Sequence, residues 1–191
     1  MAAGSPLGKP QPRSYEWNMW SAAARPLRLF AAAAALSGIA LHVAEAKPIK
    51  VFGDWSTFVE KENGHKVCYM GSEPKKTKGQ YAKRGDTYIL VTHRPAEKAI
   101  GVVSVRAGYV YKTQSEVEIK VDSVSFRLFT DGGHAWARDA KIDHKLVAAM
   151  KAVLTLIVNG FSSRGTLTTD AYSLKGFTAA YRAISKACGV E

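Results

Sequence analysis

The stretch EVEIKVDSVSFRL, residues 116–128, decides the fold class of this chain. Its apolar side chains alternate with charged ones from Glu116 to Asp122, and the alternation resumes at Val124 and runs to Leu128. Because successive side chains of a strand point to opposite faces of a sheet, this period of two predicts two half-buried antiparallel strands. Asp122-Ser123 between them is typical of a tight hairpin turn.

The same period covers most of residues 49–138 and returns near the C-terminus. An opening hairpin is expected from residues 51–59 and 66–71, because Asn63-Gly64 between them favours a hairpin turn. The other expected strands are the continuously apolar 87–92, then 102–106 with 109–111 around a bulge at Ala107-Gly108, then 134–138, then 153–158 before a turn at Asn159-Gly160, and the threonine-rich 166–172.

Two helices interrupt the β pattern. Asp143 is a good N-cap for a short helix that ends near Lys151. A C-terminal helix is expected over residues 176–187, with one apolar stripe formed by Leu174, Phe177, Tyr181, Ile184 and Cys188. The sequence therefore predicts a mainly β fold, a single antiparallel β-sandwich-like domain with a short internal helix and a C-terminal amphipathic helix.

The N-terminal region has the pattern of an export signal. Arg25 and Arg28 precede an apolar run over residues 29–43, and Ala44-Glu45-Ala46 supplies the small residues that signal peptidase requires. We expect a signal peptide over residues 1–46, cleaved after Ala46, with Met19 as an alternative start. A retained membrane anchor is the competing interpretation, but a run of about 15 residues is short against the roughly 20 that span a bilayer. The mature domain is then residues 47–191.

The chain is basic, with a formal net charge of +11, and removal of the leader leaves +9, because the leader carries four basic and two acidic residues. A basic protein favours anionic partners, and export makes nucleic acid an unexpected one. The expected partners are an envelope or host-surface protein or an anionic glycan or lipid, with peripheral contact with a membrane.

The two cysteines are expected to form a disulfide, because an exported protein meets an oxidising compartment. Cys68 lies in an expected strand and Cys188 on the stripe of the last helix, so a bridge would pin that helix to the first hairpin. Closing so long a loop should stabilise the fold by about 4–5 kcal/mol. A reactive thiol or metal pair is the alternative, but neither cysteine lies in a C-x-x-C pattern.

Several short motifs, in this order along the chain, resemble the invasion-associated locus B family of exported bacterial proteins. They are Phe52-Gly53-Asp54-Trp55, a Cys in the following strand, Leu90-Val91-Thr92-His93-Arg94-Pro95, Ala135-Trp136-Ala137-Arg138-Asp139, Arg164-Gly165-Thr166 and Tyr172-Ser173-Leu174-Lys175-Gly176-Phe177. The resemblance covers nearly all of residues 49–188, and residues 154–163 are more apolar than the family pattern. It implies a small β-sandwich-like domain in the periplasm or outer envelope, with one member linked to host-cell invasion, and it supplies no catalytic residues. The motif residues Gly53, Asp54, Trp55, His93, Arg94, Trp136, Arg138 and Arg164 are expected to be structural.

Catalytic and metal-binding patterns are weak. His65, His93, His134 and His144 are scattered, so the sequence suggests no metal site and no cofactor. His93 could act as a general base, yet nothing supplies a nucleophile and an orienting acid at recognisable spacing, so hydrogen bonds that close the strand end are preferred. Trp55 and Trp136 are expected in the core, with a sugar-stacking platform as the alternative.

A polar loop over residues 72–85 gathers five cations, Lys75, Lys76, Lys78, Lys83 and Arg84. It is either a patch that binds an anionic partner or a solvated loop that keeps the protein soluble, and the sequence favours neither. Arg84-Gly85-Asp86 is also the tripeptide that integrins bind, but a turn into the next strand explains it better.

These features predict an exported cell-envelope interaction protein without catalysis that contributes to host-cell invasion or envelope integrity. A periplasmic binding or stress-support module with no host role is the alternative. A small periplasmic enzyme that uses His93 or His134 is a third, less favoured interpretation.

Overall fold

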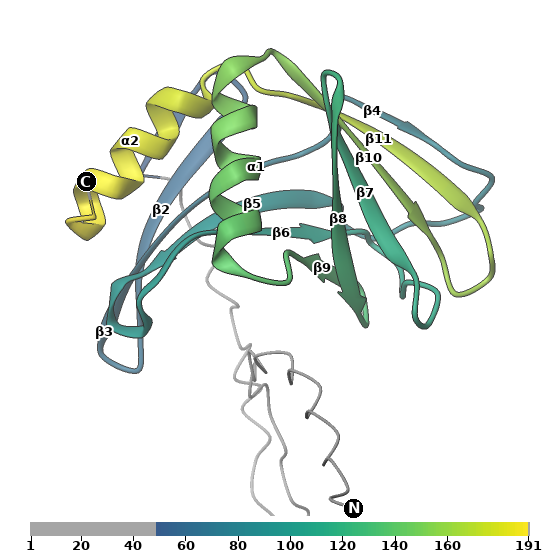
Figure 1. Cartoon of the computed structure of the whole chain (residues 1–191), viewed down its shortest axis with the longest axis horizontal. Helices are drawn as coiled ribbons and strands as arrows, with labels where there is room; N and C mark the ends of the chain where they lie inside the picture. The colour runs from purple at the N-terminus through teal and green to yellow at the C-terminus, as the bar shows by residue number, and fades with distance from the viewer. Residues whose placement is uncertain (1–48, 191) are drawn as a thin grey trace, which may run out of the picture. The chain divides into compact units, whose positions relative to one another are not determined.

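The computed structural model describes residues 49–190, so the expected signal peptide lies outside the described residues. Within them, eleven strands form one sheet, and no helix is long and apolar enough to cross a bilayer (Figure 1). The elements are β1 (Lys50–Phe52), β2 (Trp55–Glu62), β3 (His65–Ser72), β4 (Lys76–Lys78), β5 (Tyr88–Arg94), the 3-10 helix η1 (Pro95–Glu97), β6 (Ala99–Arg106), β7 (Glu116–Val121), β8 (Val124–Asp131), β9 (His134–Trp136), α1 (Ala140–Ala152), β10 (Thr155–Phe161), β11 (Leu167–Ser173) and α2 (Phe177–Cys188).

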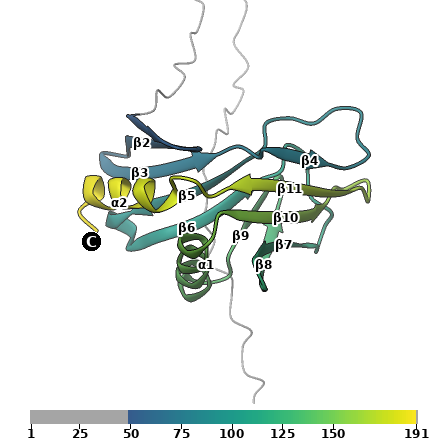
Figure 2. The same ribbon diagram turned by 90° about the horizontal axis from the view of Figure 1, so that it is seen from above.

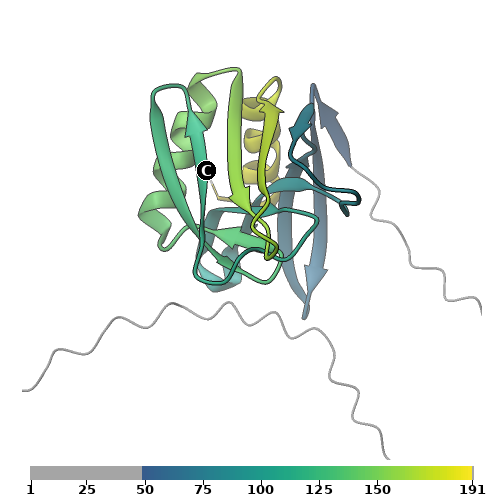
Figure 3. The same cartoon turned by 90° about the vertical axis from the view of Figure 1, so that its right-hand side faces the viewer.

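The strands follow the order β1-β2-β3-β5-β6-β9-β8-β7-β10-β11-β4, and each neighbouring pair is antiparallel. The sheet curls on itself, so that its first and last strands approach each other, and both helices complete the core (Figures 2 and 3). One continuous core contains buried side chains from both halves of the sheet and from α1 and α2. The predicted mainly β, sandwich-like fold is therefore confirmed.

The hairpins with clear turn residues form as expected. In the β7–β8 hairpin Val121 pairs with Val124, and Asp122 takes the left-handed conformation that a two-residue turn requires. In the opening hairpin Asn63 and Gly64 both have positive φ, and they join Glu62 to His65.

Three predictions about the strands and turns were wrong. Asn159-Gly160 lies inside β10 and makes no turn, because Gly160 packs where a Cβ would come within 2.8 Å of the Tyr111 ring. Residues 109–111 form only an isolated bridge between Tyr111 and Ser162. The cationic loop contains a strand, β4, which pairs with β11 and so forms one edge of the sheet.

The first helix begins earlier than expected, and Asp143 is not its N-cap. The cap is Asp139, whose carboxylate accepts a hydrogen bond from the Ile142 amide at 2.9 Å. Asp143 lies one turn inside α1, is 3% exposed, and accepts a hydrogen bond from the Val103 amide of β6 at 2.9 Å. Asp143, which the local sequence suggests as an N-cap, therefore joins α1 to the sheet.

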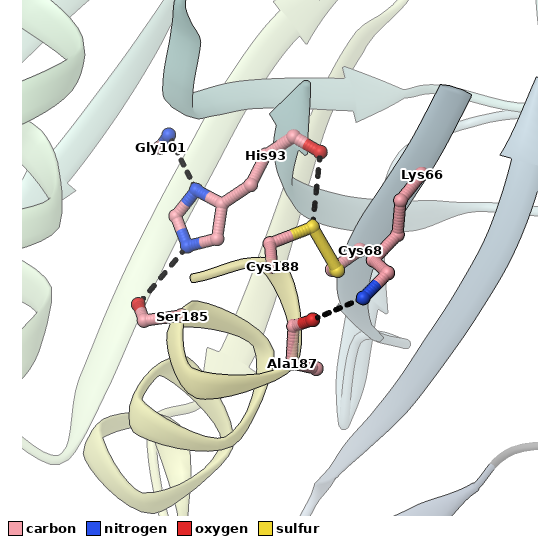
Figure 4. Close-up of a disulfide and its surroundings, with 7 residues drawn as sticks. All are labelled: Lys66, Cys68, His93, Gly101, Ser185, Ala187 and Cys188. Atoms are coloured by element: carbon pink, nitrogen blue, oxygen red, sulfur yellow. Dashed lines mark hydrogen bonds between the residues drawn. A yellow bond between two sulfur atoms is a disulfide. The ribbon is translucent and has the colours of Figure 1, made fainter. Parts of the chain in front are cut away.

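The predicted disulfide between Cys68 and Cys188 is confirmed. It joins β3 to the last residue of α2, with 5.9 Å between the two Cα atoms and a sequence separation of 120 (Figure 4). Lys66 donates to the Ala187 carbonyl at 3.1 Å, which places a cation at the C-terminal end of α2, where the helix dipole favours it. Both contacts fasten the helix to the first hairpin.

The two ends of the curled sheet meet through a backbone contact between Gly53 and residues 175–176. A Cβ at Gly53 would lie 2.5 Å from the Lys175 carbonyl oxygen, and a Cβ at Gly176 would collide with the Phe52 carbonyl. Both glycines have positive φ, 57° and 89°. The Asp54 amide donates to the Lys175 carbonyl at 3.0 Å, so this close approach also completes a hydrogen bond.

We predict that Gly176→Ala will destabilise the fold much more than Gly165→Ala. Both positions have positive φ, but nothing lies within 4 Å of a Cβ at Gly165. Gly165→Ala should cost about 1 kcal/mol of unfolding free energy through backbone strain alone, and Gly176→Ala at least about 3 kcal/mol, because the Phe52 carbonyl must also move. Chemical denaturation measures both values, and equal losses would contradict the backbone contact.

We predict that Asp143→Asn will stabilise the protein at pH 8 but not near pH 4. Burial raises the pKa of the Asp143 carboxyl to about 7, so the folded state retains a proton that the unfolded state loses above pH 4. The contribution of Asp143 to stability is therefore present at low pH and is lost as the pH rises towards 7. Asparagine keeps an acceptor for the Val103 amide without a charge, and it should gain about 2–4 kcal/mol at pH 8.

The measurement is the free energy of unfolding of both proteins between pH 4 and pH 8. Burial lowers the pKa of His93 to about 4, which gives the opposite slope, but His93 is present in both proteins and cancels in the difference. A difference that does not change with pH would rule out titration of Asp143.

Candidate functional site

His93 occupies a closed hydrogen-bonding position beside the disulfide (Figure 4). Its side chain is fully buried, and Nδ1 accepts a hydrogen bond from the Gly101 amide at 2.9 Å. The ring proton therefore lies on Nε2, which donates to Ser185 Oγ of α2 at 3.1 Å. Burial and, secondarily, the charge of Lys151 lower the pKa of His93 to about 4, which keeps the ring neutral. With both nitrogens engaged, His93 ties β5, β6 and α2 together and has no nitrogen free for a substrate.

The other motif residues on the strands also make contacts within the domain. Trp55 is fully buried, its indole donates to the Ser173 carbonyl at 3.0 Å, and its ring packs edge-on against Phe177. The expectation that Trp55 belongs to the core is confirmed. Trp136 is half-buried and packs beside His134 and Phe129.

Three arginines of the motifs have different surroundings. Arg94 forms an ion pair with Glu62 at 3.1 Å, which links the end of β5 to the end of β2. Arg138 forms one with Glu116 at 2.9 Å, between the segment after β9 and the start of β7. Arg164 is exposed in the turn between β10 and β11. The first two therefore support the sheet, and Arg164 is open to solvent.

Arg84 does not belong to the exposed cationic patch, contrary to expectation. Its side chain is 7% exposed and binds both carboxylate oxygens of Asp170 at 2.6 Å, while Nε donates to the Ala107 carbonyl at 2.6 Å. The bidentate pair neutralises both charges. The Arg84-Gly85-Asp86 tripeptide therefore cannot present its arginine to an integrin.

Asp170 is the partner that the sequence reading missed, although its position in β11 gives a signal. Thr168, Asp170 and Tyr172 are the buried members of the alternating strand. A carboxylate at an inward position of a strand requires a cation or several donors. That requirement points to a nearby buried arginine.

The remaining loop cations divide into two groups. Lys75 forms an ion pair with Asp54 at 2.6 Å. Within the described residues no ion pair is recorded for Lys76, Lys78 or Lys83, and all three are exposed. We call these three residues the loop patch. They come from edge strand β4 and the segment that follows it.

A shallow depression of about 300 Å³ lies beside the loop patch. Tyr81, Arg84 and Asp86 are among the residues that line it, and the Arg84 guanidinium lies over the Tyr81 ring at 5.5 Å. In the part of the chain that the structure describes, no group of three or more histidine, cysteine, aspartate or glutamate side chains could hold a metal ion. The geometry of this region suits electrostatic recognition at a surface.

The fold and these contacts define a class of protein: a small, disulfide-closed β domain in which the polar motif residues mainly support the structure. Residues 55–185 match the family model described as invasion associated locus B (IalB) protein, and the chain belongs to this family. The crystal structure of invasion associated protein b from Bartonella henselae is also similar, with 17% sequence identity and a TM-score of 0.49, and the match covers 72% of this chain and 95% of that one. No curated protein matches the chain.

Proposed function

We propose that this protein is an exported, non-catalytic interaction protein of the bacterial cell envelope that binds an anionic partner through the loop patch and contributes to host-cell invasion. The observation that carries the proposal is the exposure of Lys76, Lys78 and Lys83, for which the described residues provide no ion pair. Membership of a family described as invasion associated supports the role in invasion.

The loop patch has a defined geometry. Lys76 and Lys78 are on one face of β4, and Thr77 between them pairs with the buried Asp170. Two residues along a strand separate them by about 7 Å, so they can contact neighbouring anionic groups of one partner. Each exposed contact is weak and screened by salt, so affinity must come from several contacts together.

A non-catalytic role agrees with the state of the groups that carry chemistry in other proteins. His93 has both ring nitrogens engaged inside the domain, and Arg84 and Asp170 neutralise each other. Export agrees with the leader pattern of residues 1–46 and with the disulfide, because structural disulfides persist in oxidising compartments.

We predict that Lys76→Gln, Lys78→Gln and Lys83→Gln together will weaken binding to a soluble sulfated glycan such as heparin by about 10-fold or more, because three exposed positive charges that act together are lost. The matched control is Lys61→Gln, Lys141→Gln and Lys145→Gln, three exposed lysines elsewhere on the domain. The control removes the same net charge and should change binding less than threefold, a loss typical of general field effects. Titration calorimetry at two salt concentrations gives both affinities, and equal losses would show that only net charge matters.

We predict that the full-length chain, expressed in its bacterial host, yields a mature protein that begins at Lys47 and lies at the cell surface. Intact mass of the purified protein reports the cleavage site, and protease added to intact cells reports exposure. A mature protein that survives protease in intact cells and is digested after lysis would contradict surface exposure.

A further inference from the structure

The tip of the β10–β11 hairpin exposes two large apolar side chains. Phe161 and Leu167 are directly paired across the hairpin and are 43% and 49% exposed. Their neighbours Gly160 and Thr168 are buried, so Phe161 and Leu167 lie on the outer face of the sheet.

A second segment extends the same outer face. The Lys112 amide donates to the Phe161 carbonyl at 2.9 Å, and the Ser163 amide donates to the Val110 carbonyl at 2.8 Å. Tyr111 between them is buried and bridges Ser162, so the side chains of Val110 and Lys112 must point outward beside Phe161. Val110 is 58% exposed. Three large apolar side chains from separate parts of the chain thus share one exposed surface.

Cations surround this apolar surface. Lys112 belongs to the second segment, Arg164 lies in the hairpin turn, and Lys78 pairs with Thr169, two residues from Leu167. No ion pair is recorded among the described residues for these three cations. Glu118 of β7 is paired with Asn159 of β10. Its carboxylate accepts a hydrogen bond from the Asn159 side chain and forms an ion pair with Lys120. We call this surface the hairpin-tip patch: Val110, Phe161, Leu167, Lys78, Lys112 and Arg164.

We infer that the hairpin-tip patch docks onto an anionic lipid bilayer, with its apolar side chains at the level of the headgroups and its cations on the lipid phosphates. An apolar surface ringed by unpaired cations is complementary to a bilayer interface, which offers apolar chains below a layer of negative charge. The hairpin reaches the end of the domain opposite α2, so a flat surface can approach it (Figures 1 and 2). The inference rests on the proposed function, in which the partner is anionic, and it identifies that partner as a lipid.

Binding to lipid vesicles tests the inference. The protein as processed by its host is mixed with vesicles of phosphatidylcholine alone or of phosphatidylcholine and phosphatidylglycerol, and bound protein is measured by co-sedimentation. The wild type should bind the anionic vesicles, and Phe161→Ser with Leu167→Ser should lower the partition coefficient about 10-fold or more, because two inserting side chains are lost. Heparin binding of that variant should not change, since its cations remain.

The chain offers a matched control pair. Val124 and Leu154 are 50% and 75% exposed. They lie at the end of the sheet away from the hairpin tip, because Leu154 precedes β10 and the β7–β8 turn lies beside the start of β10, where Lys120 pairs with Ile157. Val124→Ser with Leu154→Ser should leave vesicle binding within twofold of the wild type, as expected for residues that remain in water. Equal losses in the two double variants would overturn the inference, and so would a wild type that binds neither kind of vesicle.

A label that senses polarity separates insertion from purely electrostatic contact. Ser163→Cys and Ser123→Cys place single thiols in the hairpin tip and in the β7–β8 turn, both exposed. With an NBD label, anionic vesicles should shift the emission of the first to the blue and leave the second unchanged. No shift at position 163 would overturn insertion while leaving the loop-patch proposal standing. Tip-dependent vesicle binding that Lys76→Gln with Lys83→Gln leaves unchanged, in a protein that also does not bind heparin, would instead overturn the loop-patch proposal alone.

Discussion

The close approach of Gly53 and Gly176 is the contact on which the rest of the domain depends, because it holds the two ends of a long sheet together. A side chain at either glycine would occupy the space of a carbonyl of the other segment, and both positions require a left-handed backbone. Once the backbones meet, Trp55 can donate to Ser173 and pack on Phe177, and α2 follows directly over the core. Two motifs that are far apart in sequence thus form one structural unit.

Buried polar groups give this mainly apolar core its specific arrangement. Arg84 and Asp170 join the segment before β5 to β11, His93 joins two strands to α2, and Asp143 joins α1 to β6. Removing such groups from water costs free energy, so each of them specifies a position more than it adds stability. Asp143 shows the cost most clearly, because burial raises its pKa to about 7 and the Val103 amide only partly opposes this rise.

The sequence predicted those parts of the fold in which local pattern and tertiary position agree. Alternation located the β7–β8 hairpin, the apolar stripe located α2, and export made the Cys68–Cys188 bridge the natural expectation. Prediction failed where one local pattern fits two structures. Asn159-Gly160 has turn chemistry, but contact with Tyr111 makes its glycine a strand residue, and Asp143 has cap chemistry four residues after the true cap. Arg84 resembled its lysine neighbours in sequence, and only the position of Asp170 distinguishes it.

The separation of Arg84 from those lysines distinguishes the two ends of the domain. The contacts that fasten the C-terminal helix, namely the disulfide, the His93–Ser185 hydrogen bond and the Lys66 cap, lie at the end where α2 meets β3 and β5. Strand β4 and the β10–β11 hairpin lie on the opposite side from α2 in two perpendicular views (Figures 1 and 2). Ordering a strand edge and a hairpin tip upon binding costs affinity. A rigid sheet behind them therefore favours recognition of a partner. The buried Arg84–Asp170 pair lies directly behind β4, since Thr77 of β4 is paired with Asp170. One cation of the loop therefore lies inside the domain, next to the edge strand that carries Lys76 and Lys78.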